Sequence, residues 1–228
     1  MNAGHDLGGK QGLGAIAPEA ETQEPIFHAD WERRVFALTL ATGMLGQWNI
    51  DESRHARERQ HPVDYISNSY YENWLAGIEK LLLEKNLLER QELQSGEVSA
   101  LSTQGHSLRV PNSNDAVKIM SSGGPTQTES DTKPVFTVGD KVRVRKLHTE
   151  GHTRSPSYTQ GSIGEVAAYW GSHVYPDKNA EGYRIGEHLY SVRFTADALW
   201  GSHSENVDIL VDLWEPYLER VAELGYHA

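Results

Sequence analysis

The sequence predicts an α+β protein, with an α-helical N-terminal domain that carries an extended arm and a C-terminal SH3-like β barrel. Apolar residues recur every three to four positions between residues 31 and 94, as in helices, but alternate with polar residues after Pro134, as in strands. Short strands separated by Gly-containing turns are typical of small, strongly bent barrels. We therefore divide the chain into an arm (1–30), a helical domain (31–94), a polar linker (95–133) and a barrel domain (134–228).

The arm is rich in glycine up to Gly14 and also contains Pro18 and Pro25. Gly and Pro interrupt helices and central strands, so this segment is expected to be irregular. A frayed terminus is one interpretation. The His5-Asp6 pair and the aromatic residues Phe27 and Trp31 favour the other, an ordered arm that lies against a partner surface.

Three helices are expected in the helical domain. Asp30 can cap a helix that begins at Trp31 and stops at Gly46, and Asp51 can cap a short second helix that ends before Pro62. A longer third helix should follow Pro62 and carry the apolar residues Tyr70, Tyr71, Trp74, Leu75, Ile78, Leu81 and Leu82. This helix is apolar over a wide arc and therefore needs two neighbours.

The linker is dominated by Ser, Thr, Gly, Asn, Gln and Pro, and it exceeds an ordinary loop in length. We expect it to drape over a surface or to be partly disordered. In the barrel domain, strict alternation predicts strands at residues 141–145, 190–194 and 207–213. Residues 136–142 are typical of a strand entry with a Gly-Asp turn.

Composition excludes several classes of function. Acidic residues outnumber basic ones 32 to 21, which argues against nucleic-acid binding because phosphates require clustered basic side chains. The absence of cysteine excludes disulfides, thiolate metal sites and thiol catalysis within the chain. Neither a signal peptide nor an apolar run of ~20 residues is present, so we expect no membrane contact and a cytoplasmic location.

The histidines do not form a metal-binding pattern. His148 and His152 are four residues apart, but Gly151 disfavours a helix there and no carboxylate stands at a zinc-motif spacing. We therefore expect no metal bound by this chain. The chain also lacks a phosphate-binding glycine loop and a nucleophile-elbow pattern.

Two arginines stand in distinctive local sequences, Arg54 before His55 and Arg154 within residues 151–158. If they converged, their planar donor forks would bind an oxyanion firmly. The chain supplies no obvious anion for them, so part of the chemistry is expected on another polypeptide. Spacing alone leaves ordinary alternatives open: a surface pair of Arg54 with Glu58, a solvated Arg154, and core positions for Tyr70 and Trp74.

Seven segments keep a characteristic order from the first residue nearly to the last. They are His5-Asp6-Leu7-Gly8-Gly9, Arg54-His55 with Glu58, Tyr70-Tyr71-Glu72 before Trp74, residues 139–144, Gly151-His152-Thr153-Arg154, Leu199-Trp200-Gly201, and residues 211–219. In order and spacing, these segments resemble the nitrile hydratase β subunit.

The resemblance implies a heterodimer with an α subunit, pairing into an α2β2 tetramer that hydrates small nitriles to amides as a hydro-lyase. In that family the α subunit holds Co(III) or Fe(III) in a Cys-rich claw with two oxidised cysteines. The ion activates the nitrile as a Lewis acid, and a sulfenate oxygen or a water attacks its carbon. Tyr70 followed by Trp74 resembles the cobalt type more than the iron type. The β subunit binds no metal and is active only with its partner.

By the same resemblance, Arg54 and Arg154 would hydrogen-bond the partner's oxidised cysteines. Tyr70 matches a tyrosine whose hydroxyl faces the active site, and Glu58 matches a carboxylate that does not bind the metal. Substrate-pocket positions of the family fall on Trp74, Ile50 and Ser53, the last being smaller than the aromatic residue of some relatives. Asn73 departs from the family, because several relatives have His there and pair it with the carboxylate.

Two alternatives come from other functional classes. The first is a nitrile hydratase activator or metallochaperone-like protein, which resembles the helical half and typically lacks the barrel. Gly151 to Arg154 and the predicted barrel argue against it. The second is a non-catalytic SH3-like interaction module without a catalytic partner.

Overall fold

The computed structural model describes residues 3–98, 108–201 and 206–221. The chain forms two compact units, which are described separately. The helical unit comprises residues 11–124 together with Ala3–His5, and the sheet unit comprises Asp6–Lys10 together with the residues that follow Gly124. Helices and an antiparallel sheet are both present, which confirms the α+β class.

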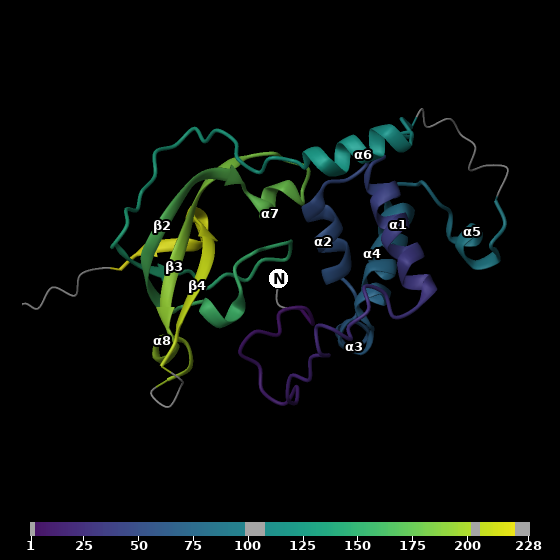
Figure 1. The fold of residues 1–228 in the computed structure, drawn as a ribbon. Helices are drawn as coiled ribbons and strands as arrows, with labels where there is room; N and C mark the ends of the chain where they lie inside the picture. The colour runs from purple at the N-terminus through teal and green to yellow at the C-terminus, as the bar shows by residue number, and fades with distance from the viewer. Residues whose placement is uncertain (1–2, 99–107, 202–205, 222–228) are drawn as a thin grey trace, which may run out of the picture. The chain divides into compact units, whose positions relative to one another are not determined.

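Three helices form the centre of the helical unit. Both α1 (Asp30–Gly43) and α2 (Ile50–Glu58) pack against α4 (Tyr70–Glu84), and the three lie side by side in Figure 1. Apolar side chains buried in this unit, among the described residues, are Val35, Ala56, Ile78 and Leu81. The shorter helices are α3 (Pro62–Ser67), α5 (Arg90–Ser95) and α6 (Ser113–Ser122). In the described parts of the chain, each helix is too short or too polar to cross a membrane.

The helix starts differ from the sequence prediction. Asp30 and Asp51 lie inside the first turns of α1 and α2 and do not cap them. The cap of α2 is Asn49, whose side-chain oxygen accepts from the backbone N–H groups of Asp51 (2.9 Å) and Glu52 (3.0 Å). An asparagine cap is as favourable as an aspartate cap, so composition alone did not distinguish the two positions.

The single helix expected after Pro62 is two helices. The backbone is extended at Asn68 and Ser69, and Ser69 starts α4 through a capping box with Glu72. The Glu72 carboxylate accepts from the backbone N–H of Ser69 at 2.6 Å. A serine followed three residues later by glutamate is a helix-start signal, and here it divides a continuous apolar stripe.

The stretch expected to be a linker contains α6, capped by Asn112, whose side chain accepts from the N–H groups of Asn114 and Asp115. Residues 99–107 of that stretch lie outside the described parts. The apolar residues Val117, Ile119 and Met120 of α6 are exposed. Because α6 buries none of its residues, its sequence lacks the apolar periodicity of a core helix.

The sheet unit is built on five antiparallel strands in the order β4-β3-β2-β1-β5. The strands are β1 (Lys141–Val144), β2 (Ile163–Val174), β3 (Gly186–Thr195), β4 (Asp208–Trp214) and β5 (Leu218–Arg220). The three predicted strands are confirmed as β1, β3 and β4. β2 and β5 were not predicted, because β2 pairs with β3 through two register shifts and β5 has only three residues. Each register shift inverts the alternation on which the prediction rests.

The sheet curves strongly, as Figure 1 shows for β2 and β3, but it is open. Among the described residues, β4 and β5 are the two edge strands and are not paired with each other, so the sheet is not closed as a barrel would be. The core lies on one side of the sheet and consists of Phe136, Val142, Val144, Val166, Tyr190, Val192, Phe194, Leu213, Tyr217 and Leu218. The expected Gly-Asp turn precedes β1, where Gly139 has a φ of 95°.

The start of the arm contacts the chain itself. In the helical unit, a Cβ on Gly4 would lie 2.8 Å from the Cα of Pro62. In the sheet unit, the Asp6 carboxylate accepts from the backbone N–H of Ser157 at 3.1 Å, and a Cβ on Gly8 would lie 2.5 Å from the ring of Tyr158. Glycine is therefore required by close packing at both positions, which a frayed terminus would not need.

Candidate functional site

Arg54 lies on α2 and is oriented by an acidic neighbour. Its Nη1 donates to Oδ1 of Asp51 at 2.8 Å, and the exposed side-chain fractions are 38% for Arg54 and 6% for Asp51. The expectation that this chain supplies no anion for Arg54 is therefore wrong. A guanidinium carries five N–H donors, so the ion pair holds Arg54 in place and leaves capacity for a second acceptor.

Glu58 ends α2 as a buried carboxylate. His5 of the arm lies beside it, with Nε2 4.0 Å from Oε1 of Glu58, and the His5 ring meets Tyr65 edge-on. Burial, and next the charge of Glu58, raises the pKa of the Tyr65 hydroxyl. Asn73 donates from Nδ2 to the backbone carbonyl of Tyr65 at 3.1 Å. The imidazole beside Glu58 thus comes from the arm and not from position 73.

Tyr70 and Trp74 share an aromatic cluster on α4, with ring centroids 5.5 Å apart. Tyr70 is the first residue of the helix and is 66% exposed, so it is not a core aromatic. Trp74 is half-buried, and its ring also lies near those of Phe36 and Tyr71. In this cluster Tyr70 is therefore exposed to solvent, while Trp74 packs against Phe36 and Tyr71.

Arg57 connects α2 to this cluster and was missed in the sequence. Its Nε donates to the backbone carbonyl of Ser53 at 3.2 Å, and its guanidinium lies 5.0 Å from the ring centroid of Trp74. A Cβ on Gly77 would lie 2.5 Å from the Arg57 stem, so glycine on α4 leaves room for this arginine. Burial lowers the pKa of Arg57. The sequence offered only an arginine four residues after Ser53 on the same helix. That this arginine faces Gly77 of α4 is seen in the structure.

The structure thus brings six predicted site residues to the adjoining helices α2 and α4 of the helical unit. Ile50 begins α2 and is 58% exposed. One turn later follow Ser53 and Arg54, both partly exposed. From α4 come Tyr70 and Trp74, with Arg57 between the helices. Glu58 lies deeper, at the C-terminal end of α2.

Arg154 belongs to the sheet unit, where it lies in the irregular segment between β1 and the 3-10 turn η1 (Ser157–Thr159). Its side chain is exposed, whereas those of His152, Thr153 and Ser155 are buried. Its backbone N–H donates to the hydroxyl of Tyr217 at 3.1 Å. The backbone of Arg154 is thus held by a hydrogen bond, while its side chain is exposed.

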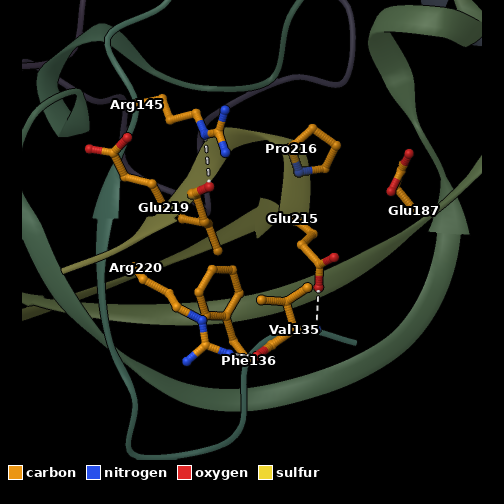
Figure 2. Close-up of a pocket in the computed structure, with 9 residues that line it drawn as sticks. Val135, Phe136, Arg145, Glu187, Glu215, Pro216, Glu219 and Arg220 are labelled. Atoms are coloured by element: carbon orange, nitrogen blue, oxygen red, sulfur yellow. Dashed lines mark hydrogen bonds between the residues drawn. The ribbon is translucent and has the colours of Figure 1, made fainter. Parts of the chain in front are cut away.

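The sheet unit also has a cavity of about 320 Å³, which is lined by none of the predicted site residues (Figure 2). Two charged side chains of the lining form hydrogen bonds within the chain: Arg145 donates to the carbonyl of Leu218, and Glu215 accepts from the backbone N–H of Val135. Burial, and next the charge of Glu215, raises the pKa of the Glu187 carboxyl. The internal hydrogen bonds of Arg145, Arg220 and Glu215 favour a structural cavity over a ligand site.

Metal-ligating side chains do not gather in the parts of the chain that the structure describes: no group of three or more His, Asp or Glu there could hold an ion. Since the chain has no cysteine, any thiolate-bound metal belongs to another polypeptide. Arg54 is partly exposed and Tyr70 is exposed on adjoining helices of this α+β chain, so both side chains are available to a ligand or to a partner.

Comparisons with known proteins identify the family. The models described as "Nitrile hydratase beta subunit, N-terminal" and "Nitrile hydratase beta subunit, C-terminal" match residues 1–118 and 125–220. The chain is 38% identical to the low-molecular weight cobalt-containing nitrile hydratase subunit beta of Rhodococcus rhodochrous, over 96% of this chain and 99% of the relative. It is 37% identical to nitrile hydratase subunit beta of Pseudomonas putida, with the same coverage. The cobalt-containing subunit beta of Pseudonocardia thermophila is 34% identical, over 97% of both chains.

This chain belongs to the nitrile hydratase β-subunit family, as the resemblance of its motifs implied. The match to the C-terminal model covers the segment that contains Arg154 and the sheet. Together, the matches to the two models favour a β subunit over an activator, which typically lacks the C-terminal part, and over a non-catalytic SH3-like interaction module.

Proposed function

We propose that this chain acts as the β subunit of a nitrile hydratase and forms, with a metal-carrying α subunit, the site at which small nitriles are hydrated to amides. The observation that carries the proposal is the Arg54 guanidinium, oriented by buried Asp51 and partly exposed on the same pair of helices as Tyr70 and Trp74. Family membership over the whole chain supports it.

We assign Arg54 and Arg154 to hydrogen bonds with oxidised cysteine ligands of the α subunit. A sulfinate or sulfenate oxygen accepts two N–H groups of a guanidinium fork, which no ammonium can match in geometry. Each arginine is fixed from within this chain, Arg54 by Asp51 and Arg154 by its backbone bond to Tyr217. Arg54 would therefore hold an oxidised ligand with a smaller loss of side-chain entropy, whereas the bond to Tyr217 fixes only the backbone from which the Arg154 side chain extends.

The metal of the α subunit supplies Lewis-acid activation of the nitrile when bound. The cysteine-free composition of this chain fits a division in which the β subunit contributes only nitrogen and hydroxyl donors. We propose Co(III) in preference to Fe(III), because two of the relatives named above are cobalt-containing.

We assign the substrate contacts to α2 and α4. The exposed ring of Tyr70 places its hydroxyl where it can hydrogen-bond a polar atom of the substrate, while Trp74, Ile50 and Ser53 supply apolar and small surfaces. Glu58 is buried beside His5 and can orient that imidazole and the neighbouring part of α2. This assigns Glu58 an indirect role, since its carboxylate is not exposed.

The partner surface is assigned to the helical unit. Exposed large apolar side chains on α1 to α4 include Trp31, Leu38, Ile50, Val63, Ile66 and Tyr70. So much exposed apolar surface is typical of a subunit interface. An αβ heterodimer that pairs into α2β2 would cover it. We place this complex in the cytoplasm, where a cysteine-free chain is at no disadvantage.

Two descriptions of the fold remain proposals. We propose the SH3-like type for the sheet unit, on the strength of its strongly curved five-stranded antiparallel sheet. We also keep the division into arm, helical domain, linker and C-terminal domain, with α6 as a helical element inside the linker.

The roles of the arginines are tested by Arg54→Lys and Arg154→Lys in the complex with the α subunit. We expect assembly to persist and turnover of propionitrile to fall roughly 10- to 100-fold, as for other groups that support metal ligands. The control is Arg59→Lys, because Arg59 pairs with exposed Glu84 and lies outside the assigned site. Wild-type turnover in both test variants would refute the assignment.

A further inference from the structure

A buried polar network lies behind the segment that carries Arg154. Tyr217 is the last residue of the 3-10 turn η2 (Glu215–Tyr217), and it is 0% exposed. Its hydroxyl accepts the backbone N–H of Arg154 at 3.1 Å and donates to the carboxylate of Asp177 in α7 (Pro176–Asn179). The hydroxyl of Tyr175 donates to the other carboxylate oxygen at 3.1 Å. Three segments distant in sequence therefore meet at one carboxylate and one backbone N–H.

The network fixes the backbone of Arg154 at the point where its side chain turns outward. Residues 145–156 have no helix or strand of their own, so the local N–H groups need acceptors from elsewhere. Tyr217 is a stiff acceptor because its ring is fully buried, with ring centroids 5.5 Å from Tyr175 and 6.3 Å from Trp214. If the backbone of Arg154 shifted, its guanidinium would shift by a similar distance. A misplacement of about 1 Å can lower the rate of a reaction that depends on positioned groups about 100-fold.

Asp177 sets the direction of the Tyr217 hydroxyl. A carboxylate accepts and cannot donate, so the tyrosine proton points toward Asp177 and an oxygen lone pair remains for the N–H of Arg154. Burial, and next the charge of Asp177, raises the pKa of the Tyr217 hydroxyl. The phenol consequently keeps its proton in the physiological range.

We propose that Tyr217, oriented by Asp177, is a positioning residue that holds the backbone of Arg154 so that its guanidinium meets the α subunit in one geometry. The inference rests on the proposed role of Arg154 and adds the residues that make this role possible. Tyr217 itself contacts neither substrate nor metal in this account.

The test is Tyr217→Phe in the αβ complex, with Tyr175→Phe as the matched control. Both variants remove one hydroxyl bound to Asp177, but only Tyr217→Phe removes the acceptor of the Arg154 N–H. We expect kcat for propionitrile to fall about tenfold in Tyr217→Phe while KM changes less than about twofold, since a positioned donor acts on turnover. Tyr175→Phe should keep wild-type turnover.

Hydrogen exchange gives a second readout that does not depend on activity. By mass spectrometry, the peptide spanning residues 152–156 should lose protection in Tyr217→Phe and keep it in Tyr175→Phe. If Tyr217→Phe does not assemble, Asp177→Asn serves instead. Its amide still accepts from the tyrosine but orients it less strictly, so we expect a smaller loss of both turnover and protection.

The outcomes separate this inference from the proposed function. Unchanged kcat in Tyr217→Phe overturns the positioning role, and so do equal losses of kcat in Tyr217→Phe and Tyr175→Phe, which would indicate only a structural network. When Tyr217→Phe does not assemble, wild-type turnover of Asp177→Asn overturns it. Wild-type turnover of Arg154→Lys refutes the role of Arg154 itself. Loss in Arg154→Lys with wild-type turnover in Tyr217→Phe leaves the proposed function standing and removes only the inference.

Discussion

Arg57 shows how one side chain can join the helices that carry the candidate site. Its aliphatic stem lies in the space left by Gly77, its Nε binds the carbonyl of Ser53, and its guanidinium lies over Trp74. The stem contributes packing and the head a cation–π contact, so this arginine acts on both helices. The residues on α2 and α4 that we assign to substrate contacts thereby keep a common geometry.

Arg57→Ala is expected to lower the free energy of unfolding of the protein by about 1 to 2 kcal/mol, through lost packing and the lost cation–π contact. Trp74 should become more exposed, which a red shift of tryptophan fluorescence would report. Arg59→Ala is the control, since its partly exposed pair with Glu84 contributes less than about 1 kcal/mol. Equal stability losses in the two variants would contradict the linking role of Arg57.

Spacing alone could not separate residues on one helical stripe. Tyr70 and Trp74 share a face of α4, so the sequence assigned them the same environment, but Tyr70 is at the helix end and stands 66% exposed. The anion for Arg54 was also missed, because Asp51 was assigned to a cap and not to an i,i+3 ion pair. The identity of the site residues came from the family pattern, which short-range spacing does not contain.

At the level of elements, β2 and β3 meet so closely that one position tolerates only glycine. A Cβ on Gly164 would lie 2.6 Å from Val192 Cγ1 and 2.8 Å from the backbone oxygen of Arg193. The backbone oxygen belongs to the sheet and cannot move aside as a flexible side chain could. The close approach of the two strands therefore depends on this residue.

We expect Gly164→Ala to lower the free energy of unfolding by about 1 to 3 kcal/mol, the usual cost of overpacking. Gly124→Ala is the matched control, because a Cβ there meets nothing within 4 Å. Urea unfolding of both variants measures the difference. An unchanged midpoint for Gly164→Ala would show that the two strands can separate at no cost.

The elements that were predicted correctly are those with a clean period. Burial alternates along β1, most of β4 and the last four residues of β3, whereas β2 changes register twice along β3. The break between α3 and α4 depends on Ser69 and Glu72, a local signal that the continuous apolar stripe concealed. Helix α6 was not predicted, because it buries no residue and its sequence therefore shows no apolar stripe.

At the level of the whole molecule, both units leave large apolar side chains exposed. The sheet unit exposes Trp170, Tyr183 and Leu210 although it surrounds a contiguous buried cluster, and the helical unit exposes large apolar side chains of α1 to α4, among them the candidate site residues Ile50 and Tyr70. Surface of this kind needs a cover in solution. This exposed apolar surface supports our proposal that the chain works in a complex with an α subunit.

The most direct test of this account compares hydration of propionitrile by three samples: this chain alone, the α subunit alone and the copurified complex, each with metal analysis. We predict amide formation by the complex only, with cobalt in the complex and no stoichiometric transition metal in the isolated chain. Amide formation or bound metal in the isolated chain would contradict the claim that it supplies half of a shared site.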